Sequence, residues 1–239
     1  MKELEDLSWF PSLLRNFQTE FIGFVVARFN VYDVFIQHLR AFPLPLRSMT
    51  DLCSGSGEPA ITIYNQSKRF SSLSLSDKYP NRSKLGDEKA PYKILVKDVL
   101  AMDFKQGTYY TMFNAFHHFR DAEKLSIVQH IQASGSGAFI VEILEPKLFC
   151  FLKVIFATTI GSVILTPLIR PFSFKRLIYT YILPVNILAI TYDGIVSVLK
   201  SRSVKQYQNL MANEGNVIKV FRLKSRFNAL IVIQIEQGK

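Results

Sequence analysis

Residues 51–59, DLCSGSGEP, decide the fold, because they have the pattern of a turn between a buried strand and a helix. The strand is expected over 49–52 and the helix over 59–68. Small residues let the backbone approach a ligand, and the N–H groups at the start of a helix are free to bind it. Asp51 would lie at the carboxyl end of the strand, where open α/β sheets bind ligands. We therefore expect a ligand-binding loop around Gly55 and Gly57.

Two further acids stand at the equivalent place after the next two expected strands. Asp77 follows the second strand in LSDKYPN, and Asp98, next to Val99, follows the third in KDVLAMDF. A carboxylate after the second strand can accept hydrogen bonds from ribose hydroxyls, and one after the third can accept from an adenine amino group. Either acid alone is more often a cap or turn residue. Beside the glycine loop, the two together predict a nucleoside site.

The rest of the chain continues an alternation of strands and helices, which favours a mostly parallel sheet covered on both faces. The last two strands are joined by a short basic link, which suggests an antiparallel strand at the end of the chain. The expected strands are 49–52, 73–76, 93–96, 109–113, 138–144, 217–223 and 229–235. The expected helices that follow the first strand are 59–68, 121–133, 193–199 and 204–213.

Length and composition exclude several classes of protein. A chain of 239 residues, 49% hydrophobic and 20% charged, can bury a core, so disorder and small disulfide scaffolds are excluded. Two cysteines and four histidines lack zinc-site spacing, and we predict no metal. The net charge of +10 attracts anionic partners. No basic stripe with stacking aromatics is visible, so nucleic acid is not expected.

An apolar region over 147–192 interrupts the alternation. Its two uncharged runs, 154–169 and 177–192, are 16 residues each and contain Pro167 and Pro184. A membrane-spanning helix needs roughly 20 apolar residues, so both runs fall short. We expect a helical insertion that lies on an anionic bilayer or covers a hydrophobic substrate; a buried helical pair and a true span stay open.

The apolar spacing of residues 1–46 predicts a helical pair, with one helix around 4–17 and a second over 19–41. We divide the chain into an N-terminal helical cap, 1–46, and a core, 47–239, that carries the insertion. The cap and the insertion together are expected to roof the ligand site.

A nicotinamide dinucleotide is the nearest rival ligand. Its loop carries G-x-G-x-x-G, and Ala60 stands where the third glycine would be. Asp51 would repel a pyrophosphate placed beside it, so a cofactor without phosphates fits better. S-adenosylmethionine, with its cationic sulfonium and amino groups, is such a cofactor.

On these motifs the chain resembles the class I S-adenosylmethionine-dependent methyltransferases, from about Ser48 to Lys239, and looks like a bacterial small-molecule branch. DLCSGSG is similar to the first motif of that family, with Cys53 at the first glycine, and FNAFHHFRDAEKL to its fourth strand and the segment that follows. The resemblance implies a Rossmann-like seven-stranded sheet and S-adenosyl-L-methionine as cofactor. It implies that the donor is held by Asp51, Cys53, Gly55, Gly57, Asp77, Asp98, Val99 and Asn114.

Three residues are candidates for the chemistry. His117 and His118 follow the fourth strand and could take a proton from an acceptor, since a histidine titrates near pH 6.5. Asp193 stands where the apolar region joins the next helix and could face the pocket, or cap that helix. Glu142, in the fifth strand, must be paired or face the site, because an unpaired buried carboxylate is costly.

The sequence thus predicts an enzyme that methylates a hydrophobic or aromatic small molecule or lipid, on oxygen, by in-line transfer. The alternatives are an NAD(P)-dependent Rossmann oxidoreductase and a non-catalytic protein of the same fold that binds the membrane surface. We expect a cytoplasmic protein, and a peripheral contact with the anionic inner face of the membrane stays open. The sequence leaves the oligomeric state unknown.

Overall fold

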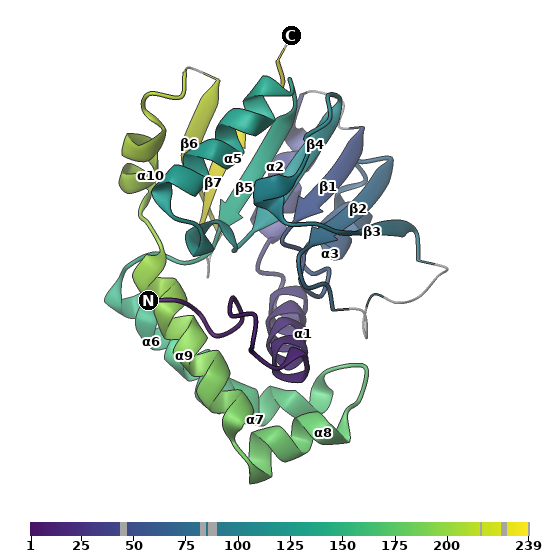
Figure 1. Cartoon of the computed structure of the whole chain (residues 1–239), viewed down its shortest axis with the longest axis vertical. Helices are drawn as coiled ribbons and strands as arrows, with labels where there is room; N and C mark the ends of the chain where they lie inside the picture. Colours follow the sequence, from purple (N-terminus) through teal and green to yellow (C-terminus); the bar gives the residue numbers. More distant parts are fainter. Residues whose placement is uncertain (44–46, 82–84, 86–89, 216, 226–228, 239) are drawn as a thin grey trace.

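Seven strands form one sheet in the order β3-β2-β1-β4-β5-β7-β6 in the computed structural model of the chain (Figure 1). The structure describes residues 1–43, 47–81, 85, 90–215, 217–225 and 229–238. β7 runs antiparallel to both of its neighbours, and the other pairs are parallel. The predicted sheet is confirmed, including the reversed strand. The strands are β1 Ser48–Leu52, β2 Ser72–Asp77, β3 Tyr92–Val96, β4 Thr108–Phe113, β5 Gly137–Glu142, β6 Ile218–Lys224 and β7 Ala229–Ile235.

Helices cover both faces of the sheet and one of its ends (Figure 1). The α-helices are α1 Ser12–Arg28, α2 Asp33–Ala41, α3 Ala60–Ser67, α5 Asp121–Ala133, α6 Leu148–Phe156, α7 Ser162–Leu165, α8 Phe174–Leu177, α9 Val185–Lys200 and α10 Val204–Met211. Short 3₁₀ turns span Val99–Ala101, Phe116–His118 and Thr166–Leu168, and wider π turns span Ala157–Gly161 and Ile178–Ile182.

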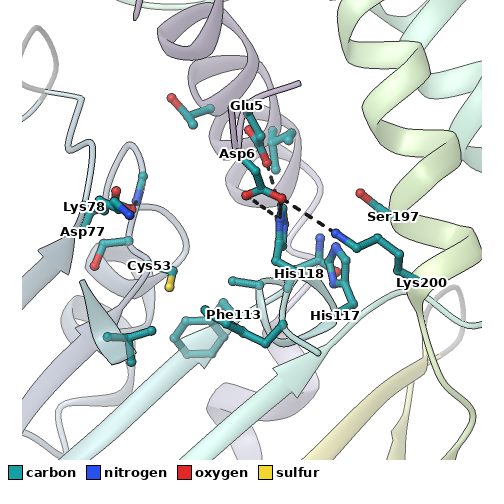
Figure 2. A pocket seen from close by; sticks show the side chains of 18 of the residues that line it. Glu5, Asp6, Cys53, Asp77, Lys78, Phe113, His117, His118, Ser197 and Lys200 are labelled. Atoms are coloured by element: carbon teal, nitrogen blue, oxygen red, sulfur yellow. Dashed lines mark hydrogen bonds and ion pairs between the residues drawn. The ribbon is translucent and has the colours of Figure 1, made fainter. Parts of the chain in front are cut away.

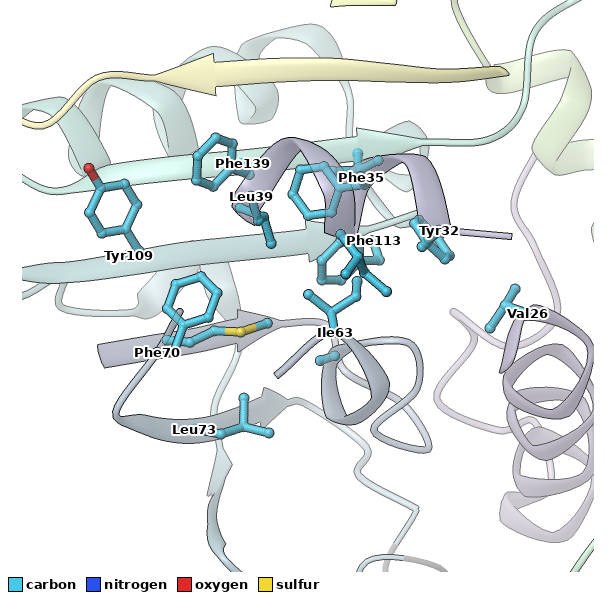
Figure 3. Packing of buried hydrophobic residues seen from close by; sticks show 14 of the residues in the cluster. Val26, Tyr32, Phe35, Leu39, Ile63, Phe70, Leu73, Tyr109, Phe113 and Phe139 are labelled. Atoms are coloured by element: carbon cyan, nitrogen blue, oxygen red, sulfur yellow. The ribbon is translucent and has the colours of Figure 1, made fainter. Parts of the chain in front are cut away.

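Alternation along the strands produces two apolar layers. In β5, Phe139 packs in the layer beneath α2 and α3, whereas Ile140 packs in the layer beneath α5 and α10. Figure 3 shows Phe35 and Leu39 of α2 lying over Phe113 and Phe139. The ring of Phe35 stands edge-on to both phenylalanines, at 5.7 and 5.6 Å between centroids. Each such buried ring contributes roughly 2 kcal/mol, so this packing fixes the strands that carry the site.

The N-terminal residues differ in part from the helical pair that the sequence predicts. Residues 1–11 make turns, α1 begins at Ser12, and α2 belongs to the core layer rather than to a roof. α1 packs against the insertion through Phe17 on Ala189 and Phe21 on Ile190, and residues 3–5 bond to α9. The expected boundary at residue 46 lies outside the described residues.

The insertion is more continuous than its prolines suggest. One helix runs over Leu148–Leu168, 21 residues with mean hydropathy 2.2, and Pro167 lies in its last turn. The returning limb, Phe174–Ile182 and Val185–Lys200, bends by 78° at Pro184. The first helix is long and apolar enough to cross a membrane by length and composition, so the expectation that both runs are too short is wrong for it. The helix expected at Asp193 begins eight residues earlier, at Val185.

Candidate functional site

A cavity of about 1210 Å³ lies at the carboxyl ends of the first four strands. Its floor comes from the loops after those strands, and its roof from residues 1–6, α1 and the end of α9. Figure 2 shows its side chains in two groups, one around Cys53 and Asp77 and the other around His117 and His118. Of the predicted site residues, those that line the cavity are Cys53, Gly55, Asp77, Asp98, Val99, Asn114, His117 and His118.

The glycine loop turns from β1 into α3 through three residues of left-handed backbone. Cys53, Gly55 and Gly57 have φ of 57, 52 and 85°. Gly57 faces away from the cavity, because a Cβ there would lie 2.7 Å from Ile61 Cδ1 and 2.8 Å from Leu85 Cδ2. It lets α3 pack closely against the loop, and it is not a direct ligand residue. Cys53 occupies a conformation that costs an ordinary residue about 1 kcal/mol or more.

Asp77 joins the loops that follow β1 and β2. Its Oδ2 accepts the Gly55 N–H at 2.7 Å, and its Oδ1 accepts the Tyr79 N–H at 2.7 Å. Burial raises the pKa of the Asp77 carboxyl, and the two N–H donors act in the opposite direction. The Tyr79 ring lies under the guanidinium of Arg15, 4.5 Å from it. The loop therefore presents a fixed carboxylate to the cavity.

Asp98 and Val99 form the next part of the wall. The Asp98 carboxylate caps the turn by accepting the Leu100 N–H at 3.1 Å, and it accepts Lys78 Nζ at 2.9 Å. Burial alone would raise the pKa of Asp98, but Lys78 and the Leu100 N–H lower it below its usual value. Val99 is buried and adds an apolar contact surface beside this acid.

The structure does not place Asp51 in the cavity. Its side chain is 2% exposed and accepts the Thr111 hydroxyl at 2.7 Å, across the register pair of β1 and β4. Burial raises the pKa of Asp51 to about 7. The acid that opens the motif thus ties two strands together beneath the loop, and the predicted direct contact with a donor is not supported.

Asn114 ends β4 in a left-handed conformation, with φ 49°. Its N–H donates to Val141 O at 2.8 Å, and its Oδ1 accepts the Ile143 N–H at 3.4 Å. These bonds hold the ends of β4 and β5 together at the middle of the cavity wall, between the two groups of side chains.

His117 and Glu142 form a buried pair. Nδ1 of His117 lies 2.7 Å from Glu142 Oε2, and the other oxygen of Glu142 accepts the Phe116 N–H at 2.7 Å. An ionised carboxylate can only accept, so a proton on Nδ1 faces Glu142, and Nε2 is the nitrogen that could exchange a proton with an acceptor. Nε2 is buried without a hydrogen-bond partner among the described residues. Glu142 is paired, as the sequence predicts, and it orients the His117 ring.

His118 has the opposite environment. Its Nε2 lies 3.3 Å from Glu3 and 3.7 Å from Glu5, and its Nδ1 lies 3.1 Å from Asp6. Burial alone would lower the pKa of His118, but the three acids raise it to about 9. At neutral pH the ring is an imidazolium with no lone pair, so His118 cannot serve as the predicted base.

Sequence reasoning expected residues 1–11 in the roof but missed that their acids contact the histidines and α9. Glu3, 1% exposed, accepts Ser197 Oγ at 2.9 Å and Lys200 Nζ at 3.0 Å. Asp193 accepts the Leu4 N–H at 2.5 Å and the Glu5 N–H at 3.2 Å, and burial raises the pKa of Asp193 to about 6.

Asp193 therefore anchors the segment from inside α9. It neither lines the cavity nor caps a helix, and its predicted catalytic position is wrong. The sequence does show a cluster of acids at the start of the chain, and this was the available signal. Nothing near them in the sequence shows that their partners lie almost 200 residues away.

Glu3, His117 and His118 are the group of three that, among the described residues, brings possible metal ligands within 4.8 Å. The His118 proton and the Glu3 carboxylate satisfy each other, and Glu142 holds the other nitrogen of His117. Ion pairing accounts for this grouping without a metal. The absence of a metal site stays a prediction.

No protein-family model and no curated protein matches the sequence. Among solved structures, the chain is similar to the plantazolicin methyltransferase BpumL in complex with SAH, at TM-score 0.57 and 11% identity, over 95% of this chain and 96% of that one. It is also similar to human N-acetylserotonin methyltransferase in complex with SAM, at TM-score 0.51 and 16% identity, and to the mitomycin 7-O-methyltransferase MmcR, at TM-score 0.51 and 14% identity.

These alignments cover 87% of this chain for the human enzyme and 86% for MmcR. The chain spans about half the length of both proteins, 53% in each case. At these identities the likeness concerns the fold. The chain has the fold of the S-adenosylmethionine-dependent methyltransferases, with the reversed strand and the strand-end cavity in place.

Proposed function

We propose that the protein is an S-adenosylmethionine-dependent methyltransferase that transfers a methyl group to the oxygen of a hydrophobic or aromatic molecule. The observation that carries the proposal is His117, which lines the cavity with a buried, unpartnered Nε2 and a carboxylate behind its Nδ1. The fold and the acid-lined glycine loop support S-adenosylmethionine as the methyl donor.

The residues of the loop suit a sulfonium nucleoside. Each oxygen of Asp77 accepts one N–H and keeps a further lone pair, so the carboxylate can accept ribose hydroxyls. Val99 offers an apolar surface to a base, and Asp98 offers an acceptor for an amino group. Cys53 and Gly55 bring backbone to the cavity wall.

The same loop argues against a dinucleotide, although for a different reason from the one given by the sequence. Asp51 is buried away from the cavity, so it does not repel a pyrophosphate there. The Gly55 N–H, which a phosphate would need, already donates to Asp77. The loop offers a phosphate a carboxylate in place of an N–H group, and like charges repel.

The chemistry assigned to the chain is proton removal and alignment. S-adenosylmethionine supplies a methyl group on a cationic sulfur. His117 Nε2 would take the proton of the acceptor hydroxyl as the oxygen displaces sulfur from the methyl carbon, so that the carbon–sulfur bond breaks and S-adenosylhomocysteine leaves; Glu142 would stabilise the imidazolium. Ile22, Val26 and Phe113 add apolar cavity wall, which favours an acceptor with an apolar body.

Titration calorimetry tests the donor. We expect S-adenosylmethionine and its demethylated product to bind in the micromolar range, and NADH and NADPH not to bind. Transfer is then followed with methyl-tritiated donor and alkylated naphthol probes, as tritium extracted into organic solvent. Binding of a nicotinamide dinucleotide without binding of either sulfur nucleoside would refute the proposal.

A further inference from the structure

The first helix of the insertion exposes apolar side chains where a helix that faces water would expose polar ones. Its large apolar side chains are exposed; Phe156, for example, is 60% exposed. They recur three to four residues apart, which places most of them on one side of the helix. The set is Leu148, Phe149, Leu152, Phe156, Ile160, Val163, Ile164 and Leu168.

The side of the same helix that faces the protein carries a stripe of small hydroxyl residues beside Val154 and Leu165. Thr158, Ser162 and Thr166 are buried and stand four residues apart, so they form one stripe. The Thr158 hydroxyl donates back to Val154 O at 2.8 Å. Small hydroxyl residues inside and large apolar residues outside are the arrangement of a helix whose outer medium is itself apolar.

The returning limb repeats this arrangement. Arg176, Thr180 and Asn186 are buried, and Arg176 is ion-paired with Glu20 of α1 and donates to the carbonyls of Ile169 and Pro171. The exposed apolar side chains on this limb and the loop before it are Phe172, Phe174, Ile178, Tyr181, Ile182, Leu183, Val185, Leu188 and Tyr192. We call the exposed apolar side chains of 148–192 the outer face of the insertion.

The charges around this face are mostly basic. Residues 147–202 contain a single acid, Asp193, which is buried. Seven basic residues fall in the same range, and four of them are exposed: Lys147, which is ion-paired with Glu145, and Lys153, Arg170 and Lys175. An exposed apolar face bordered by lysine and arginine matches the boundary between acidic headgroups and acyl chains.

The opposite, inner face of the insertion packs on α1. Ile169 and Ile190 pack on Phe21 of α1, and the buried Glu20–Arg176 pair lies in the same contact. α1 in turn lines the cavity through Arg15 and Thr19. One side of the insertion is therefore committed to the protein, and only the outer face is available to lipid.

We propose that the outer face of the insertion docks on an anionic lipid bilayer, with its apolar side chains at the headgroup–acyl boundary and its exposed basic residues on acidic headgroups. The proposal is independent of methyl transfer, because it concerns a surface and not the cavity. Docking would hold the cavity roof, which α1 and the end of α9 help to form, beside the membrane.

Trp9 reports docking without any substitution. It is the sole tryptophan, it is 69% exposed, and it borders an apolar groove together with Leu188 and Tyr192 of α9. With vesicles of phosphatidylcholine and phosphatidylglycerol we expect a blue shift of its emission and quenching by brominated acyl chains. Binding should weaken at least tenfold in pure phosphatidylcholine. An unchanged Trp9 spectrum and no flotation with anionic vesicles would overturn the proposal.

A pair of matched variants locates the contact. Leu152→Glu, Phe156→Glu and Phe174→Glu together place three charges on the outer face and should weaken flotation at least a hundredfold. Phe29→Glu, Val96→Glu and Val217→Glu change exposed apolar residues elsewhere, 42 to 56% exposed, and should leave it unchanged. Calorimetry with S-adenosylmethionine on both triple variants separates this surface from the donor site, since donor binding should be unaffected.

The competing occupant is a second copy of the chain. Sedimentation of the wild-type protein without lipid would then show a dimer that the first triple variant dissociates, and flotation would be absent. That result contradicts lipid docking. Equal flotation of wild-type protein and the first triple variant contradicts it as well.

Discussion

The cavity has two ends that are built from different parts of the chain (Figure 2). At the glycine-loop end, formed by Cys53, Gly55 and Asp77, a carboxylate accepts backbone N–H groups of neighbouring loops. At the histidine end, formed by His117 and His118 with the N-terminal acids, charged side chains meet across more than 100 residues of sequence.

The difference assigns the two ends separate tasks. The glycine-loop end is held by backbone bonds of the sheet, so its geometry does not require residues 1–11. The histidine end contains His117, backed by Glu142, and His118, surrounded by Glu3, Glu5 and Asp6. The ring of His117 leaves one nitrogen without a partner and suits the proposed chemistry, whereas the ring of His118 is ion-paired to the roof.

The sharpest test of this division is His117→Gln. Removing the base should lower the rate of methyl transfer to a naphthol probe by about 10²–10⁴-fold, because positioned proton transfer contributes that much. Affinity for S-adenosylmethionine should stay unchanged, since the glycine-loop end is intact. His130→Gln, on the exposed side of α5, is the control and should behave like the wild type. A variant that transfers at the wild-type rate would remove His117 from the chemistry.

The next largest effect is expected at the other end, from Asp77→Ala. The variant loses both the acceptors for a ribose and the bonds to Gly55 and Tyr79, so affinity for the donor should fall at least about 100-fold, or 2.7 kcal/mol. Asp98→Ala should cost about tenfold, because this carboxylate is more exposed and already paired with Lys78. Calorimetry measures both, with circular dichroism to check the fold. A larger loss for Asp98→Ala would reverse the assignment.

The glycine-loop end was predictable because its information is local. An apolar run, small residues and an acid at each strand end predict β1, β2 and β3 and the side chains beyond them. Asp51 is the exception within it. Its position in the motif suggests that its side chain faces the cavity. In the parallel pairing of β1 with β4, however, Asp51 lies opposite Thr111, and its carboxylate accepts the Thr111 hydroxyl.

The histidine end was only half predictable. His117 and His118 were found from their place after β4, but their different surroundings come from Glu142 and from the N-terminal acids, which no spacing rule connects to them. The start of α9 was misplaced for a related reason. Pro184 was taken as an interruption and Asp193 as a boundary, whereas the helix begins right after the proline.

A smaller effect concerns pH and stability at the histidine end. The folded pKa of His118, about 9, lies above the value near 6.5 of an unfolded chain. The imidazolium therefore stabilises the fold fully below pH 6.5, and this contribution is lost as pH rises through 9. We expect the contribution to be about 2 kcal/mol or less.

Wild-type protein and His118→Gln should thus differ in free energy of unfolding at pH 8 and converge by pH 10. In this window Glu5 and Asp51, with pKa of about 7, are already ionised. Denaturant unfolding at both pH values measures the difference. A constant difference between the two proteins would mean that the ring is not charged in the fold.

The smallest effect returns to the glycine-loop end, at Cys53. Its φ of 57° is easy for glycine and costly for a residue with a Cβ, so Cys53→Gly should be more stable than Cys53→Ala by about 1 kcal/mol. Cys150, within the helix α6, should show the opposite order by a similar amount, since glycine is the weaker helix former there. Thermal unfolding of the four variants measures both signs. If alanine is preferred at both cysteines, the left-handed turn at Cys53 is wrong, and with it the loop geometry that presents Asp77 to the donor.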